Sequence, residues 1–250
     1  MASRRARGRD VRGVLLLDKP PGLTSNRALQ RVKRLYDAAK AGHTGSLDPL
    51  ATGMLPICFG AATRLSGSLL EAGKTYAVEA EFGVATDTAD ADGTVVERRE
   101  TESAPSRTQV LAVLASFVGE LEQVPPMYSA LKHEGRRLYE LARRGIVVER
   151  PPRRISVSRI ELDDYRWPVC AFTVDCSKGT YVRSLVVDIA AALGTLGHVT
   201  ALRRLAVQPF AGQLMLRLEG LEAAGTEGFE ALDSLLLSIE RVHQLLERAP

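Results

Sequence analysis

The stretch from Gly42 to Ser66 contains residue types that could do chemistry, and Asp48 lies at its centre. Asp48 precedes Pro49, whose ring fixes its own φ and removes an amide donor, so the carboxylate is expected on a stiff loop. Gly42 and Gly45 would let the backbone take a positive φ or approach a ligand closely. The pattern predicts a carboxylate presented on a rigid loop. A carboxylate that only caps a turn is the alternative, because Asp beside Pro is common in turns.

Arg183 is a second charged residue whose position carries a prediction. Residues 177–183 lead from an apolar segment into a helix that we expect to continue through Ala192. Arg183 falls in the first turn, where a cation opposes the positive end of the helix dipole at a cost of up to about 1 kcal/mol. An anion opposite would remove that cost. Arg183 is therefore predicted to contact a carboxylate or a phosphate, and an exposed arginine is the alternative.

The composition is that of a soluble globular protein. Hydrophobic residues make up 45% and charged residues 25% of the 250 residues, and no apolar run approaches the ~20 residues of a membrane span. The N-terminus lacks the apolar segment of a secretory signal, so a cytoplasmic location is expected. Cys58, Cys170 and Cys176 have no metal-site spacing and are predicted to be reduced core residues.

Charge is distributed unevenly along a chain whose net charge is +3. Residues 132–159 contain nine Lys or Arg and three Glu, a local charge of +6. Residues 75–102 contain eight acids and two Arg, a local charge of −6. This segregation predicts a basic face suited to a phosphate backbone, and two differently solvated faces are the alternative.

One acidic segment imitates a metal-binding motif. Asp90, Asp92 and Gly93 resemble part of an EF-hand loop, but the first and twelfth positions would be Thr88 and Arg99, which cannot supply the required carboxylates. We therefore predict an acidic turn there, and no metal site or cofactor site elsewhere.

The elements that must position these residues alternate between strands and helices. Strict alternation over Lys74–Phe82 predicts a half-buried strand with Tyr76 on its apolar side. Further strands are expected at residues 13–17, 55–59, 155–162, 169–176 and 198–207, and helices from Thr24 or Ser25, at 61–71, from Ser106 to Gly119 and at 136–144. The pairing in the strand-rich middle is predicted to be antiparallel.

The two ends of the chain differ from its middle. Residues 1–12 hold five arginines and are predicted to be a basic, flexible N-terminus, followed by the main domain at 13–212. Residues 213–250 are predicted to be an acidic C-terminal segment, with a linker at 223–228 and one amphipathic helix that packs on the main domain.

Four separated segments together resemble the bacterial TruB family of tRNA pseudouridine synthases. They are Asp18-Lys19-Pro20 with Gly22 and Thr24-Ser25, the stretch GHTGSLDPLATGMLPICFGAATRLS at 42–66, VPPMYSALKHEGRRLYELARRG at 124–145, and CSKGTYVRSL at 176–185. The similarity spans residues 13–210. It implies an α+β pseudouridine synthase fold, with a long mixed and largely antiparallel sheet flanked by helices.

The resemblance also implies roles for particular residues. Asp48 matches the nucleophilic aspartate of the family, Tyr76 a tyrosine that lies against the target base, and Arg183 an arginine that pairs with that aspartate. Tyr181 and Leu202 match residues lining the uracil pocket, and His43 matches one that helps to occupy the space left by the flipped nucleotide. The substrate would be the T-loop uridine of tRNA, with the T-stem-loop bound by a monomer that needs no protein partner.

These roles are chemically sensible, because pseudouridine formation breaks a glycosidic bond and rejoins the same uracil through C5. No group is added, so one carboxylate and no cofactor can suffice. Asp48 could attack C6 of uracil, attack C1′ of the ribose, or assist loss of a 2′ proton. The base must first leave its stack, at a cost of a few kcal/mol that contacts to the RNA would offset.

Longer members of the family continue into an RNA-binding PUA-type domain, which is expected to be absent or reduced here. Two other functions stay open. One is an RNA chaperone that folds tRNA without chemistry, and the other is an RNA-guided pseudouridine synthase core that works inside a ribonucleoprotein.

Overall fold

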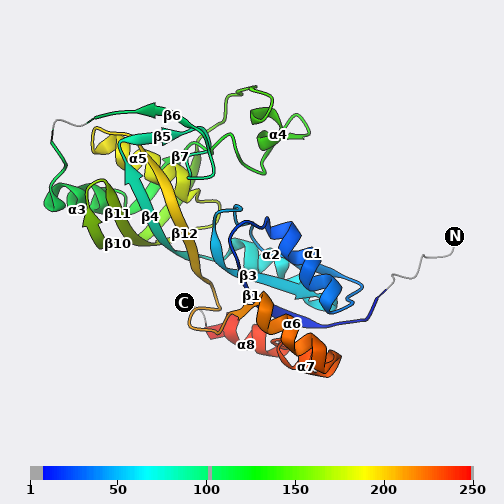
Figure 1. The fold of residues 1–250 in the computed structure, drawn as a ribbon. Coiled ribbons are helices and arrows are strands. Elements are labelled where there is room, and N and C mark those ends of the chain that lie inside the picture. Colours follow the sequence, from blue (N-terminus) through cyan, green and yellow to red (C-terminus); the bar gives the residue numbers. More distant parts are fainter. Residues whose placement is uncertain (1–7, 101–102, 249–250) are drawn as a thin grey trace. The chain divides into compact units, whose positions relative to one another are not determined.

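The computed structural model of the protein describes residues 8–100 and 103–248. They form two compact units (Figure 1). The first, here called the terminal unit, is built from both ends of the chain, Met1–Thr75 and Arg203–Pro250. The second, the central unit, is Tyr76–Leu202.

The terminal unit is organised around two buried antiparallel strands, β1 (Gly13–Lys19) and β3 (Thr52–Phe59). β2 (Ala41–His43) pairs antiparallel with β3, and β13 (Leu216–Arg217) pairs parallel with β1. The end of β12 (Gly197–Val207) runs parallel to β3, through Arg203 and Arg204. The sheet is therefore mixed.

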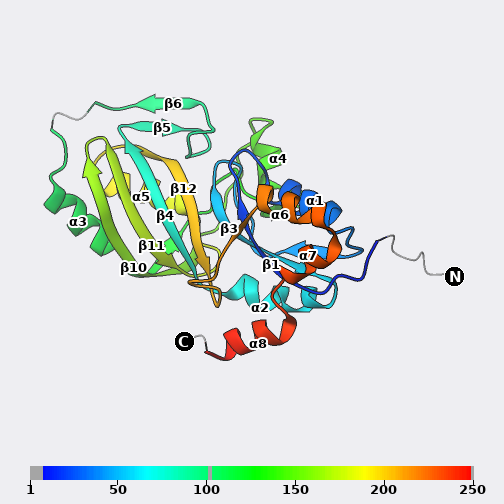
Figure 2. The same cartoon turned by 60° about the horizontal axis from the view of Figure 1, so that its bottom comes forward.

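Alternate residues of β1 enter two separate cores, because successive side chains of a strand point to opposite faces. Leu15 and Leu17 pack with residues of α1 (Ser25–Leu35), α6 (Leu218–Glu227) and α7 (Phe229–Ser234). Val14 and Leu16 pack with η1 (Gly60–Leu65), α2 (Ser66–Glu71) and α8 (Ile239–Arg248). Figure 2 shows α1, α6 and α7 together, and α2 beside α8. Helices thus cover both faces.

The C-terminal segment differs from the predicted linker and single helix. Three helices occupy it, and α6 continues through the expected linker to Glu227. Ala223 and Ala224 favour helix, and the buried Leu221 holds α6 on the sheet, so the local glycine signal is overridden. α6 ends at Glu227, and the following Gly228 has a φ of 114°.

Residues 8–12 also differ from the predicted flexible N-terminus, whose remaining residues 1–7 lie outside the described part of the chain. Arg9 forms a β-bridge with Ala38 and an ion pair with Asp233 of α7, and its guanidinium lies 4.0 Å from the ring centroid of Phe229. Val11 is buried. The segment is thereby fixed to the terminal unit.

The central unit contains strands in the order β12-β4-β11-β10-β7. These are β4 (Lys74–Phe82), β7 (Gly119–Gln123), β10 (Arg153–Arg166) and β11 (Val169–Cys176), with β10 antiparallel to both β7 and β11. A hairpin of β5 (Val84–Thr86) and β6 (Val95–Arg98) follows β4. The helices α3 (Arg107–Ser116) and α5 (Val182–Ala192) pack against each other, and α3 packs against β10 (Figures 1 and 2).

The predicted α+β class, with a mixed and largely antiparallel sheet flanked by helices, is confirmed. The basic helix expected at 136–144 is shorter than predicted. A hairpin of β8 (Lys132–His133) and β9 (Arg136–Arg137) precedes α4 (Leu138–Ala142). Glu134 and Gly135 between the two strands both have positive φ, which is the geometry of a two-residue hairpin turn.

Candidate active site

The loop that carries Asp48 connects β2 to β3 and is held on both sides of that residue. Ser25, at the start of α1, accepts a hydrogen bond from the Leu47 amide (2.7 Å) and donates one to the Leu47 carbonyl (3.1 Å). On the other side, the Pro49 carbonyl accepts from the Gly22 amide (2.9 Å). Asp48 is only partly buried, so its carboxylate is presented by a backbone fixed at the residues before and after it.

A fully buried lysine adds to this support. Lys19, the last residue of β1, donates through Nζ to the carbonyls of Pro20 (2.8 Å), Leu23 (2.7 Å) and Pro49 (3.3 Å). A buried ammonium group is stable only if its donors are satisfied. Lys19 therefore ties the turn after β1 to the Asp48 loop, and the stiff loop predicted from Pro49 is observed.

His43 lies in β2 at the entry to the same loop. Burial lowers the pKa of its imidazole, and the charge of Arg204 lowers the pKa further. Its Nδ1 atom is buried and has no hydrogen-bond partner among the described residues. The ring is accordingly neutral at neutral pH.

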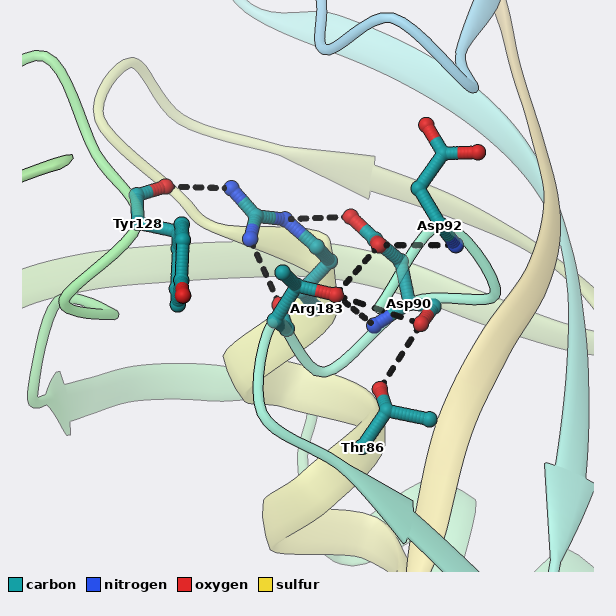
Figure 3. Close-up of polar contacts among 6 residues, drawn as sticks. Thr86, Asp90, Asp92, Tyr128 and Arg183 are labelled. Carbon is teal, nitrogen blue, oxygen red and sulfur yellow. Dashed lines mark hydrogen bonds and ion pairs between the residues drawn. The ribbon is translucent and has the colours of Figure 1, made fainter. Parts of the chain in front are cut away.

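Arg183 lies in the first turn of α5, and its side chain is buried (Figure 3). Its guanidinium donates to the carbonyls of Thr88 (2.6 Å) and Tyr128 (2.8 Å), and Nε lies 3.5 Å from a carboxylate oxygen of Asp90. Within the central unit, Arg183 therefore contacts one carboxylate, that of Asp90.

Asp90 is held in place by its own turn. Its carboxylate accepts from the Thr88 hydroxyl (2.6 Å) and from the Asp92 amide (3.2 Å), and its carbonyl accepts from the Thr86 hydroxyl (2.7 Å) (Figure 3). The segment is the acidic turn that the sequence predicted. Sequence reasoning missed the role of Asp90, although the unfavourable position of Arg183 was a signal that a carboxylate would lie opposite.

The remaining predicted residues lie in the central unit. Tyr76 is buried on the apolar side of β4, as predicted, and Leu202 is buried in β12. Tyr181 forms the N-cap of α5, and the buried Gln123 brackets it by accepting from its amide (2.8 Å) and donating to its carbonyl (3.1 Å).

The six predicted site residues thus divide between the two units. His43 and Asp48 share one loop region of the terminal unit, whereas Tyr76, Tyr181, Arg183 and Leu202 belong to the central unit. The pairing of Arg183 with Asp48 stays a prediction.

The basic segment from Lys132 to Arg159 presents most of its cations to solvent. Side chains on β8, β9, the turn after α4 and the start of β10 are exposed: Lys132, Arg136, Arg137, Arg143, Arg144, Arg153 and Arg154. Arg159 instead pairs with Asp175 and Glu161. The central unit therefore has a cationic surface of the kind that binds phosphates.

Among residues 8–100 and 103–248, no group of three or more His, Cys, Asp or Glu is placed to hold a metal ion. Within the same residues, no helix has the length and apolar character that a membrane span requires.

Comparison with known proteins places the chain in a class. In structure it is similar to a chain of a Cbf5-Nop10-Gar1 complex, with a TM-score of 0.73 and 28% identity over 93% of this chain and 62% of that one. Residues 33–182 match the model of the TruB family pseudouridylate synthase N-terminal domain, and residues 183–244 match the tRNA pseudouridylate synthase B C-terminal domain. The chain is a pseudouridylate synthase by fold and sequence.

Within that class the chain belongs to the TruB family. It is 53% identical to tRNA pseudouridine synthase B of Nitrosococcus oceani, over 96% of this chain and 77% of that protein. It is 55% identical to the protein of the same name from Chromohalobacter salexigens, over 90% of this chain and 74% of that protein. The similarity reaches beyond residue 210, where the resemblance in motifs ended, and includes α6, α7 and most of α8.

Proposed function

We propose that the protein isomerises the T-loop uridine of tRNA to pseudouridine, with Asp48 as nucleophile. The observation that carries the proposal is the Asp48 loop, whose backbone is fixed by Ser25, Lys19 and Gly22 within a TruB-family chain. A reacting carboxylate must be held in attack geometry before the substrate arrives, and a loop anchored on both sides achieves this. The relatives named tRNA pseudouridine synthase B support tRNA as the substrate.

Asp48 acts in its ionised form. It attacks C6 of the uracil or C1′ of the ribose, or it assists removal of the 2′ proton, and each route leads to cleavage of the N1–C1′ bond followed by reattachment through C5. The atoms of substrate and product are the same, so the carboxylate is regenerated at the end and no co-reactant is consumed.

The central unit supplies the side chains that would act together with Asp48. Arg183 offers a buried guanidinium, which would favour the ionised form of Asp48 when bound RNA excludes water. Tyr76, Tyr181 and Leu202 would line a pocket in which the detached uracil can rotate without diffusing away. The role of Asp90 is to hold Arg183, because it pairs with that guanidinium from a turn fixed by Thr86 and Thr88.

Binding of the T-stem-loop rests on the exposed cations between Lys132 and Arg154. His43 would occupy the space left by the flipped nucleotide, offsetting part of the cost of unstacking. The protein works as a monomer without a protein partner. It acts in the cytoplasm, where bacterial tRNA is made and used.

The decisive experiment compares Asp48→Asn with the wild type on an unmodified tRNA transcript. Derivatised pseudouridine is measured by mass spectrometry of RNA digests, and tRNA affinity is measured on the same protein. We expect no product from Asp48→Asn and tRNA affinity close to that of the wild type, because the substitution removes the nucleophile and keeps the size of the side chain. Asp164→Asn, on the exposed part of β10, is the matched control and should react normally.

Two outcomes would refute the proposal. Product formation by Asp48→Asn would remove Asp48 from the chemistry. A wild-type protein that binds the transcript and leaves it unmodified would indicate either a chaperone or a guide-dependent core, which addition of guide RNA would separate.

A further inference from the structure

Arg204 is the largest fully buried side chain of the described residues, with 1% of its surface exposed. It lies near the end of β12, and its guanidinium reaches two segments of the terminal unit. Nε donates to the Met54 carbonyl of β3 (2.7 Å), and Nη2 donates to the Gly45 carbonyl of the Asp48 loop (3.0 Å). Arg204 therefore joins the loop to the sheet.

The charge of this guanidinium is not neutralised locally. Its acceptors are neutral carbonyls, and no carboxylate in the described part of the chain forms an ion pair with it. The neighbouring Arg203 differs, because it pairs bidentately with Asp18 at 2.9 Å. Burial of an unpaired charge is costly, and a neutral side chain of similar length could fill the same space.

We propose that Arg204 is a positioning residue for the reaction, which holds the Asp48 loop through Gly45 and keeps a fixed positive charge beside it. The inference rests on the proposed pseudouridine synthase function. It assigns to Arg204 two tasks that can be separated by substitution, a geometric one through the hydrogen bond and an electrostatic one through the charge.

The geometry leaves the guanidinium little freedom. Gly45 has a φ of 73°, and a Cβ added there would lie 3.4 Å from Nη1 of Arg204. Gly53 has a φ of 96°, and its Cβ would lie 2.2 Å from the Arg204 carbonyl oxygen. Gly53 is therefore required by the close approach of the Arg204 backbone, whereas Gly45 is favoured by its own positive φ, because 3.4 Å is an ordinary contact distance.

The positive charge of Arg204 acts on His43, at the entry to the Asp48 loop. After burial, Arg204 is the second cause that lowers the pKa of His43, two residues before Gly45. Bound RNA brings phosphates and excludes water, and both changes disfavour an ionised carboxylate. A fixed cation beside the loop opposes these changes and so favours the reactive form of Asp48 in the complex.

The test compares Arg204→Met, which removes charge and donors, with Arg204→Lys, which keeps the charge and a donor. Arg203→Met is the matched control on the adjacent residue. Single-turnover pseudouridine formation at saturating enzyme, tRNA affinity and thermal unfolding are measured for each protein.

We expect Arg204→Met to react about 100-fold more slowly, the loss typical of a misplaced reacting group. We expect unchanged tRNA affinity, a rate for Arg204→Lys between those of Arg204→Met and the wild type, and a normal rate for Arg203→Met.

A second measurement separates positioning from a general loss of packing. The imidazole of His43, followed by NMR across pH, should titrate at a higher pKa in Arg204→Met than in the wild type and should return toward the wild-type value in Arg204→Lys. If Arg204→Met does not fold, Arg204→Gln, which removes the charge and keeps a donor, is measured in its place, and we expect a slower reaction from a folded protein.

The outcomes distinguish this inference from the function on which it rests. A wild-type enzyme that forms no pseudouridine would refute the proposed function. An active wild type with normal rates in the folded Arg204 variants, or a loss confined to tRNA affinity, would overturn the inference alone.

Discussion

His43 makes the stability of the protein depend on pH in a way that can be measured. Its folded pKa is below the ordinary value of 6.5, because the ring is buried and lies near Arg204. As pH falls through 6.5, the His43 imidazole takes up a proton in the unfolded chain but stays neutral in the folded chain. The free energy of unfolding therefore decreases until the folded ring also protonates. We expect His43→Gln to remove this decrease, and denaturant unfolding from pH 7.5 downward would show a flatter profile.

The control for that experiment is His243→Gln, because His243 is exposed on α8. Its unfolding profile should match the wild type. If His43→Gln and the wild type lose stability in parallel below pH 6.5, the depressed pKa of His43 is wrong.

Asp90 should contribute strongly to stability, because it shares a buried ion pair with Arg183. Removal of one partner of a buried ion pair typically costs about 3–5 kcal/mol. We expect Asp90→Asn to lower the free energy of unfolding by an amount near that range, and to slow pseudouridine formation because Arg183 is no longer held. Asp92→Asn is the control, since its exposed carboxylate forms none of the contacts in Figure 3. Equal stability of the two variants would contradict the structural role of the pair.

At the scale of the elements, the start of α1 does two separable things. Thr24 caps the helix by accepting from the Arg27 amide (3.2 Å), whereas the adjacent Ser25 binds the Leu47 backbone of the Asp48 loop. Loss of a helix cap typically costs about 1 kcal/mol, and a buried backbone group left unpaired costs about 1–3 kcal/mol. We expect Thr24→Ala and Ser25→Ala both to reduce stability, but only Ser25→Ala to slow the reaction.

Unfolding curves and single-turnover rates for the two alanine variants would check this expectation. The comparison is informative because the residues are adjacent and belong to the same helix end. A normal rate in Ser25→Ala would show that Lys19 and Arg204 hold the loop without it.

Elements with a clear pattern of their own were predicted from the sequence, whereas an element whose own residues carry no such pattern was missed. The cap at Thr24 and the capping box of Ser106 with Gln109 are observed, since each depends on residues within one turn. β7 was missed because Gly119–Gln123 is polar and lacks β-branched residues, and it becomes a strand only by pairing with β10. The same limit applies to the site, where Asp90 reaches Arg183 across 93 positions of sequence.

At the scale of the whole molecule, the C-terminal helices are part of the structure that carries the Asp48 loop. Leu218, Leu221 and Leu232 pack in one core with β1 and β3, and Val242 packs in the other. The backbone of Val14 in β1 also exchanges two hydrogen bonds with Leu237, each 2.9 Å. β1 and β3, the second of which follows the Asp48 loop, therefore depend on a segment that lies more than 150 positions later in the sequence.

This dependence predicts how the chain responds to loss of its end. Deletion of residues 213–250 would expose the apolar faces of β1 and β3, so we expect an insoluble or unfolded product. Leu221→Ala in the full chain should lower the free energy of unfolding by about 2–5 kcal/mol, whereas Leu214→Ala should change it little, because Leu214 is 81% exposed. Solubility, circular dichroism and denaturant unfolding of the three proteins would measure the effect. A truncated chain that unfolds with the wild-type midpoint would show that the terminal unit is stable without these helices, and the two cores would then have to be assigned to the strands and the N-terminal helices alone.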